Sequence, residues 1–147
     1  MKFNYTYQKV LDLKTNEKTQ AEWMLSAAIG ELQAEQRSLL QLQEDRQRVI
    51  AAIQEMAEKS SSLSQLQEMQ QYADYLDHCI QKKIEDVDYA ERKVEVKQAQ
   101  LNNKMLDEKV WLKAKEKALS VFQQQVLLRE QSELDEMASV RFAMNTR

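Results

Sequence analysis

The chain has 147 residues, with one Gly, no Pro and a formal net charge of −3 from 21 basic and 24 acidic residues. Sheets rely on tight turns that favour Gly and Pro, so the composition disfavours α/β and all-β folds. Phosphate-binding loops and nucleophile elbows need several glycines, and Gly30 is the only glycine. A zinc site needs three or four ligands, and His78 and Cys79 are the only histidine and cysteine. The acidic balance disfavours nucleic acid as a partner. We therefore expect no enzyme, and no catalytic, cofactor-binding or metal-binding residue.

We expect no segment of this sequence to direct the chain into or across a membrane. Met1 is not followed by the apolar core of a signal peptide. The longest uncharged runs, Trp23–Gly30 and Leu119–Leu128, are far shorter than the roughly 20 residues that span a bilayer. We expect a soluble cytoplasmic protein.

Apolar residues recur at alternating spacings of three and four over most of the chain, which predicts a coiled coil. The first helix is expected over about 3–58, with Gly30 tolerated inside it. Trp23–Ile29 is apolar around more of the helix than one seam needs, which fits either a third packed element or a docking patch. Polar residues are expected at several seam positions: Gln36, Gln43, Arg46, Gln98, Glu108 and Lys115.

A serine cluster predicts a turn at about 59–63 and a second helix over about 64–142. Either Ser62 with Gln65 or Ser64 with Gln67 can form a capping box there. A short connection makes the helices antiparallel, so the predicted fold is an all-α helical hairpin forming one coiled-coil domain, 1–147.

A turn centred near residue 60 sets residue i beside residue 121 − i, which places Phe3 beside Ala118. Residues 119–147 then overhang the first helix while keeping apolar side chains such as Phe122, Val126 and Phe142. A helix that stays apolar beyond its partner is expected to bind something else.

Three segments resemble the FliJ family of the bacterial flagellar type III export apparatus. They are the opening Phe3-x-Tyr5-x-Tyr7-Gln8-Lys9-Val10-Leu11-Asp12, the segment Gln70-Gln71-Tyr72-x-x-x-Leu76-x-x-x-Ile80, and the closing Glu133-Leu134-Asp135-Glu136-Met137-x-x-x-Arg141-Phe142. Their order and spacing cover essentially the whole chain.

The resemblance implies a non-enzymatic stalk, without a cofactor, for flagellum biogenesis and motility. Such a stalk sits in the central hole of a FliI-like export ATPase hexamer and promotes ring assembly and ATP hydrolysis. It also contacts the cytoplasmic region of a FlhA-like export gate and binds export chaperones. Its membrane association, at the inner face of the flagellar base, is peripheral and runs through these partners only.

The resemblance and the overhang together nominate two contact surfaces. The gate surface carries over to Tyr72 and Leu76, with Cys79 and Lys83 on the same face but of less typical residue types. The end that holds both termini is expected to enter the ATPase ring, through these residues: Tyr5, Tyr7, Gln8, Phe122, Val126, Arg129, Glu133, Arg141 and Phe142. The alternatives are a general coiled-coil adaptor or chaperone and the analogous stalk of a virulence injectisome.

Overall fold

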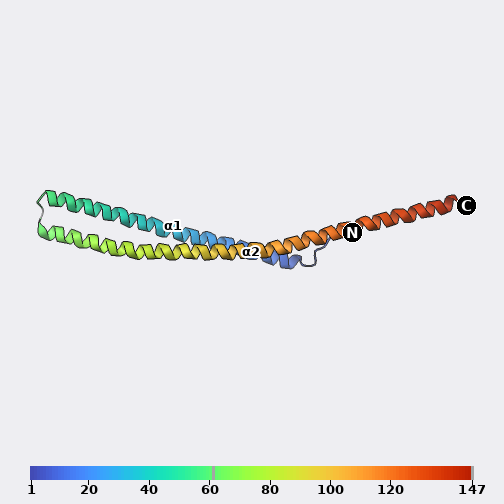
Figure 1. Ribbon diagram of the computed structural model, residues 1–147, viewed down its shortest axis with the longest axis horizontal. Helices are drawn as coiled ribbons and strands as arrows, with labels where there is room; N and C mark the ends of the chain where they lie inside the picture. The colour runs from blue at the N-terminus through green and yellow to red at the C-terminus, as the bar shows by residue number, and fades with distance from the viewer. Residues whose placement is uncertain (61, 147) are drawn as a thin grey trace. The chain divides into compact units, whose positions relative to one another are not determined.

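The computed structural model describes residues 1–60 and 62–146 and contains two long helices, α1 (Gln8–Glu58) and α2 (Leu63–Asn145) (Figure 1). The described residues contain no strand. The predicted all-α hairpin is therefore confirmed. The first helix begins at Gln8 rather than at Phe3, and α2 extends to Asn145 rather than to residue 142.

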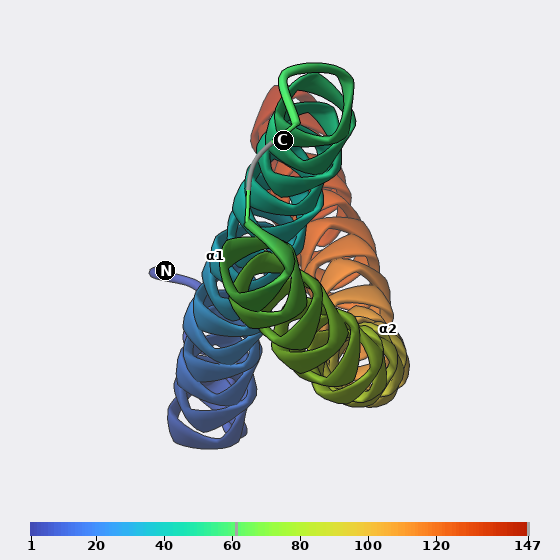
Figure 2. The same ribbon diagram turned by 90° about the vertical axis from the view of Figure 1, so that its left-hand side faces the viewer.

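The chain divides into two compact units to which both helices contribute. We call Gln20–Asn102 the hairpin unit, and Met1–Thr19 with Asn103–Arg147 the terminal unit. In the hairpin unit the two helices run antiparallel beside each other, and Figure 2 views them from the end that carries their connection.

The core of the hairpin unit lies on one stripe of each helix. Val49, Ala73 and Leu76 form a buried cluster, against which four half-buried side chains pack: Leu42, Ile50, Ile53 and Met69. The inward positions recur every three or four residues, as a two-helix seam requires. Hydrophobic burial along this stripe is what holds the two helices together.

Ion pairs flank the seam of the hairpin unit. Lys83 Nζ lies 2.9 Å from Glu35 Oε2, Lys93 Nζ lies 2.9 Å from Glu31 Oε2, and Arg46 pairs with Asp77. Partly exposed pairs of this kind contribute at most about 1 kcal/mol each. Their larger effect is on register, because opposite charges meet only in one alignment of the helices.

The polar seam expectation is right at some positions and wrong at others. Glu108 is buried, and Arg46 and Lys115 are half-buried, whereas Gln36, Gln43 and Gln98 are exposed. In each case the preceding residue is half-buried and takes the inward position instead: Glu35, Leu42 and Lys97. One residue turns a helix by about 100°, so this small phase error moves a side chain from the seam to the solvent.

Ser60 and Ser62 lie in the connection between the helices, at the end of α1 and at the start of α2. The Lys59 N–H donates to the Glu55 carbonyl over 3.1 Å, and Ser60 follows with a φ of 58°, the left-handed conformation that ends many helices. The Ser62 Oγ accepts the Gln65 N–H over 3.3 Å, which caps α2. Ser62, not Ser64, is therefore the cap; Ser61 lies outside the described residues.

Gly30 lies inside α1 and does not interrupt it. A Cβ built on Gly30 would meet no atom within 4 Å, so no close approach requires glycine at this position. The expectation of a tolerated mid-helix glycine is confirmed.

In the terminal unit, the start of α1 packs beside α2 in the predicted register. Lys14 Nζ lies 2.9 Å from Asp107 Oδ2 and Lys104 Nζ lies 3.3 Å from Glu17 Oε2, and both pairs obey the 121 − i rule. The buried Glu108 accepts a hydrogen bond from Lys18 Nζ over 3.1 Å. Hydrogen bonds from Thr15 and Lys18 lower the pKa of Glu108.

Candidate docking surfaces

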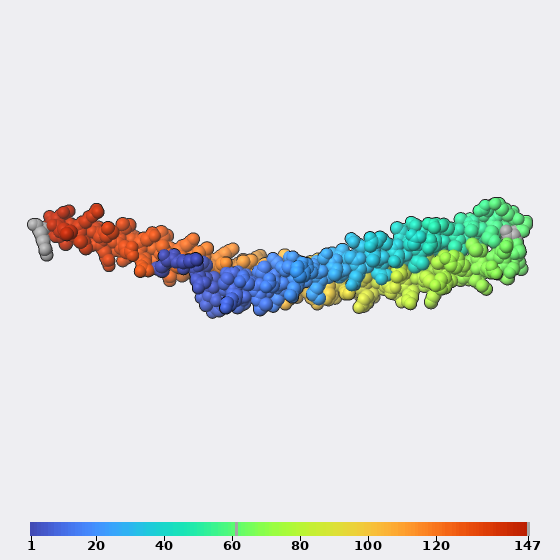
Figure 3. All heavy atoms as spheres, turned by 180° about the vertical axis from the view of Figure 1, so that it is seen from behind, coloured from blue at the N-terminus to red at the C-terminus, as the bar shows by residue number. Residues whose placement is uncertain are grey.

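Residues 1–7 precede the first helix and lie along α2 within the terminal unit (Figure 3). Tyr5 is buried, at 8% exposed, and its hydroxyl donates to the Trp111 carbonyl over 3.4 Å. The Tyr7 ring lies 6.0 Å from that of Tyr5 and 5.7 Å from that of Trp111. We call Tyr5, Tyr7 and Trp111 the aromatic anchor.

The first three residues, Met1–Phe3, continue from this anchor along α2, and we call them the N-terminal tip. The Phe3 and Phe122 ring centroids are 5.5 Å apart, and Met1 Sδ lies 3.6 Å from Arg129 Nη1. The placement of Phe3 beside Ala118 is therefore wrong. An extended residue advances about 3.3 Å against about 1.5 Å in a helix, so a non-helical segment reaches further along α2 than a helix would.

The N-terminal tip also shortens the predicted overhang. Phe122 and Val126, expected to lie uncovered, are half-buried. Every residue from Leu127 to Thr146 is exposed, and we call this segment the α2 tail. Its large apolar side chains are between 58% and 73% exposed: Leu127, Leu128, Leu134, Met137, Val140, Phe142 and Met144.

The residues nominated for the ATPase ring fall into two groups in the terminal unit. Tyr5, Tyr7, Gln8, Phe122 and Val126 lie where the N-terminal segment meets α2, with Gln8 as the first residue of α1. The others lie at the base of the α2 tail or along it: Arg129, Glu133, Arg141 and Phe142. Arg129 Nε and Glu133 Oε1 are 3.8 Å apart on one exposed face.

Sequence reasoning missed Met1, Phe3 and Trp111 as members of this surface. The aromatic opening was a usable signal for Phe3. Nothing in the periodicity indicates that Trp111 faces the N-terminal segment rather than solvent, because that contact depends on where the first helix starts.

The residues nominated for the export gate lie on α2 of the hairpin unit and differ in accessibility. Tyr72 is 47% exposed and its ring lies 6.4 Å from that of Tyr75 in a stacked arrangement. Leu76 is only 4% exposed and belongs to the core cluster. A hydrogen bond with the half-buried Cys79 raises the pKa of the Tyr75 hydroxyl.

Lys83, the fourth nominated gate residue, is engaged within the chain. Its ammonium group bonds Glu35 over 2.9 Å and lies 3.6 Å from Asp86, and the hydrogen bond to Glu35 raises its pKa. Tyr72, with its neighbour Tyr75, is thus the accessible part of this surface.

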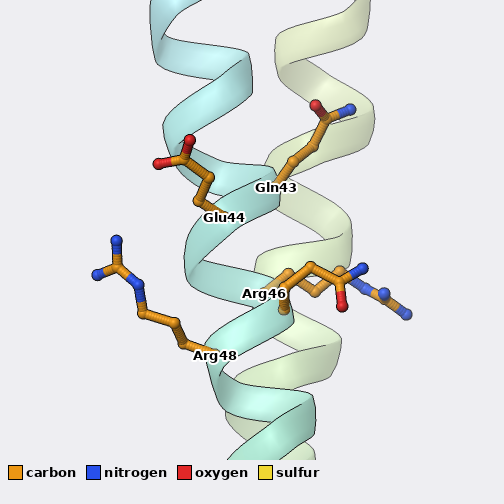
Figure 4. Close-up of a pocket in the computed structure, with 5 residues that line it drawn as sticks. Gln43, Glu44, Arg46 and Arg48 are labelled. Carbon is orange, nitrogen blue, oxygen red and sulfur yellow. The ribbon is translucent and has the colours of Figure 1, made fainter.

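A pocket on α1 of the hairpin unit has no convergent chemistry. It is lined by Gln43, Glu44, Arg46, Gln47 and Arg48. Figure 4 shows Glu44 and Arg48 pointing away from α2, while Gln43 and Arg46 extend on the other side of α1. Arg46 is also paired with Asp77. These side chains do not face a common centre.

The wide apolar face at Trp23–Ile29 is open on the outside. Trp23 is 70% exposed, Met24 49% and Ile29 38%, so no third element of the described chain buries them. Among the described helices, none combines the length and apolarity needed to cross a membrane.

The architecture defines a class of protein, a helical hairpin whose second helix carries an unpartnered apolar end. Residues 3–147 match the family described as Flagellar FliJ protein, and the chain belongs to that family. FliJ proteins are components of the type III export apparatus.

A solved structure shares the fold over nearly its whole length. It is protein CT670 from Chlamydia trachomatis, described as a candidate YscO homologue, with a TM-score of 0.68 and 19% sequence identity. The match covers 99% of this chain and 98% of that one. The curated proteins gave no match.

Proposed function

We propose that this chain is a non-enzymatic central stalk of the flagellar export apparatus that promotes assembly and activity of the export ATPase ring. One observation carries the proposal: the α2 tail presents a continuous helix with seven large apolar side chains exposed. A concentration of large exposed apolar side chains on one segment commonly marks a surface that a partner covers. An amphipathic helix that enters an apolar-lined opening is one of the recurring modes of recognition.

The charges of the α2 tail fit a specific contact as well as a hydrophobic one. Arg129, Glu133 and Arg141 lie among the apolar side chains, where polar groups can fix orientation at the rim of an interface. A single rod in a ring of six subunits cannot contact them all equally. It would bias the subunits through differential contacts and needs no catalytic residue of its own.

The test is ATP turnover by a purified FliI-like ATPase with the full chain and with residues 1–129. Every hydrogen bond and ion pair between the N-terminal segment and α2 involves residues up to Arg129, so the truncation spares them. We expect stimulation to be lost while helicity per residue is retained.

Point variants provide a matched control for the truncation. Leu134→Ser and Leu40→Ser both alter an exposed leucine, at 65% and 56% exposure, but only Leu134 lies in the α2 tail. We expect Leu134→Ser to weaken stimulation several-fold and Leu40→Ser to leave it unchanged. Undiminished stimulation by residues 1–129 would exclude the removed part of the α2 tail and place the motor contact either at the retained surface around Phe122 and Val126 or at the connection near Ser60–Ser64.

We further propose that Tyr72 contacts the FlhA-like export gate, and that export chaperones are additional partners. The exposed Tyr72–Tyr75 stack supports the gate contact, since paired aromatic rings at a surface are typical binding anchors. Binding of the gate's cytoplasmic region is expected to weaken in Tyr72→Ala but not in Tyr89→Ala, which removes a 71% exposed tyrosine from the same helix. Equal binding by both variants contradicts the gate proposal, and co-purification from a lysate tests the chaperones.

A further inference from the structure

The N-terminal tip occupies part of the surface that the stalk proposal assigns to the ATPase ring. Phe3 packs on Phe122 with ring centroids 5.5 Å apart, and Met1 reaches Arg129. Beyond this contact every residue of the α2 tail is exposed, whereas Phe122 and Val126 are half-buried. Two apolar side chains at the base of the tail are therefore covered by the chain itself.

The N-terminal segment is held firmly at one end and loosely at the other. At the aromatic anchor, Tyr5 is 8% exposed, donates a hydrogen bond to Trp111 and lies beside Tyr7, which also packs on Trp111. The N-terminal tip packs through the Phe3–Phe122 pair, and Met1 lies against Arg129 while staying 80% exposed. The tip can therefore lift about Asn4 while the anchor stays in place.

We propose that the N-terminal tip is a displaceable cover over Phe122 and Val126, which the ATPase ring must move aside to bind. This inference rests on the proposed stalk function and adds a regulatory step to the same surface. The face of Phe122 that packs on Phe3 cannot pack against a ring subunit at the same time. The ring therefore binds the uncovered form, and its apparent affinity is reduced by the fraction of molecules in that form.

Removing the cover is expected to strengthen ring binding. In Phe3→Ala the tip loses its aromatic contact, so the concentration for half-maximal stimulation of the ATPase falls. If the cover is closed nine times in ten, the fall approaches about tenfold while maximal stimulation is unchanged. Trp23→Ala is the matched control, because it removes a 70% exposed aromatic ring from the hairpin unit. It should leave the half-maximal concentration unaltered.

Fixing the cover in place tests the opposite direction. Phe3→Cys with Phe122→Cys, in a Cys79→Ser background, places two thiols on the tip and on α2, and free-thiol titration verifies the disulfide that joins them after oxidation. The concentration that gives half-maximal stimulation of the ATPase should be at least tenfold higher for the oxidised protein than for the same protein after reduction. Comparing one protein in two redox states removes the effect of the substitutions themselves.

The outcomes separate the cover from the stalk function. Normal stimulation by the unaltered chain, with Phe3→Ala unchanged or weaker, would overturn the cover alone; the weaker result would make Phe3 part of the ring contact. No stimulation by the unaltered chain would overturn the stalk function and the cover with it. A lower half-maximal concentration for Phe3→Ala, together with a higher one for the oxidised protein, supports the cover.

Discussion

The hairpin unit and the α2 tail contain similar proportions of apolar residues but use them differently. In the hairpin unit Val49, Ala73 and Leu76 are buried between two helices. In the α2 tail, which continues the same helix, Leu134 and Phe142 are 65% and 72% exposed. Helical apolar periodicity therefore marks a surface suited to packing, but it does not indicate whether this chain or another molecule packs there.

The strongest test of this difference is a pair of matched leucine truncations. Leu76→Ala should destabilise the protein by about 2–4 kcal/mol, because it removes buried methyl groups and leaves a cavity. Leu134→Ala should change stability by less than about 0.5 kcal/mol, because its side chain is already in water. Urea unfolding followed by circular dichroism measures both. Similar losses in the two variants would show that the α2 tail is covered within the protein.

The second test is the pH dependence carried by Glu108 in the terminal unit. Its folded-state pKa is lowered, first by the Thr15 hydrogen bond and then by Lys18. A lowered folded-state pKa stabilises the protein above the ordinary value near 4.5, and that contribution disappears as the pH falls through the folded-state pKa.

Glu108→Gln should therefore cost about 1.5 kcal/mol at neutral pH and flatten the loss of stability on acidification. Glu136→Gln, in the exposed α2 tail, is the control for the general effect of one fewer negative charge. Unfolding curves between pH 7 and pH 3 provide the measurement. Parallel pH profiles for the two variants would contradict a special role for Glu108.

A smaller effect is expected at the cap of α2. Ser62→Ala removes the oxygen that accepts the Gln65 N–H and should cost about 1 kcal/mol. Ser64 is the second residue of α2. Ser64→Ala should be neutral or slightly stabilising because Ala is the better helix former. The two melting temperatures decide between Ser62 and Ser64 as the functional cap.

The smallest expected effect is a gain at Gly30. Gly30→Ala should stabilise the protein by about 0.5–1 kcal/mol, because a helical Ala loses less backbone entropy and its Cβ meets open space. A measurable loss of stability would indicate that α1 bends or that another molecule approaches closely at this position.

The elements that depend on local chemistry could be predicted from the order of residues alone. The absence of Pro and the single Gly disfavoured sheets, the spacing of apolar residues predicted two helices, and the serine cluster located their connection to within a few residues. The antiparallel register near Lys14 and Asp107 followed from the position of the connection near residue 60. The resemblance of three motifs led to the FliJ family, which the family match over residues 3–147 confirms.

The conformation of the first residues depends on long-range contacts with α2 and could not be predicted from local spacing. The periodicity of Phe3, Tyr7 and Val10 fits a helix, but α1 starts at Gln8. The residues before it hold Tyr5 and Tyr7 at Trp111 and bring Phe3 to Phe122 and Met1 to Arg129. Long-range packing likewise determines that Leu76 is buried while Tyr72 is exposed, and that Leu42 rather than Gln43 faces the seam. Which side of a helix is covered depends on where distant residues lie, and local spacing does not encode that.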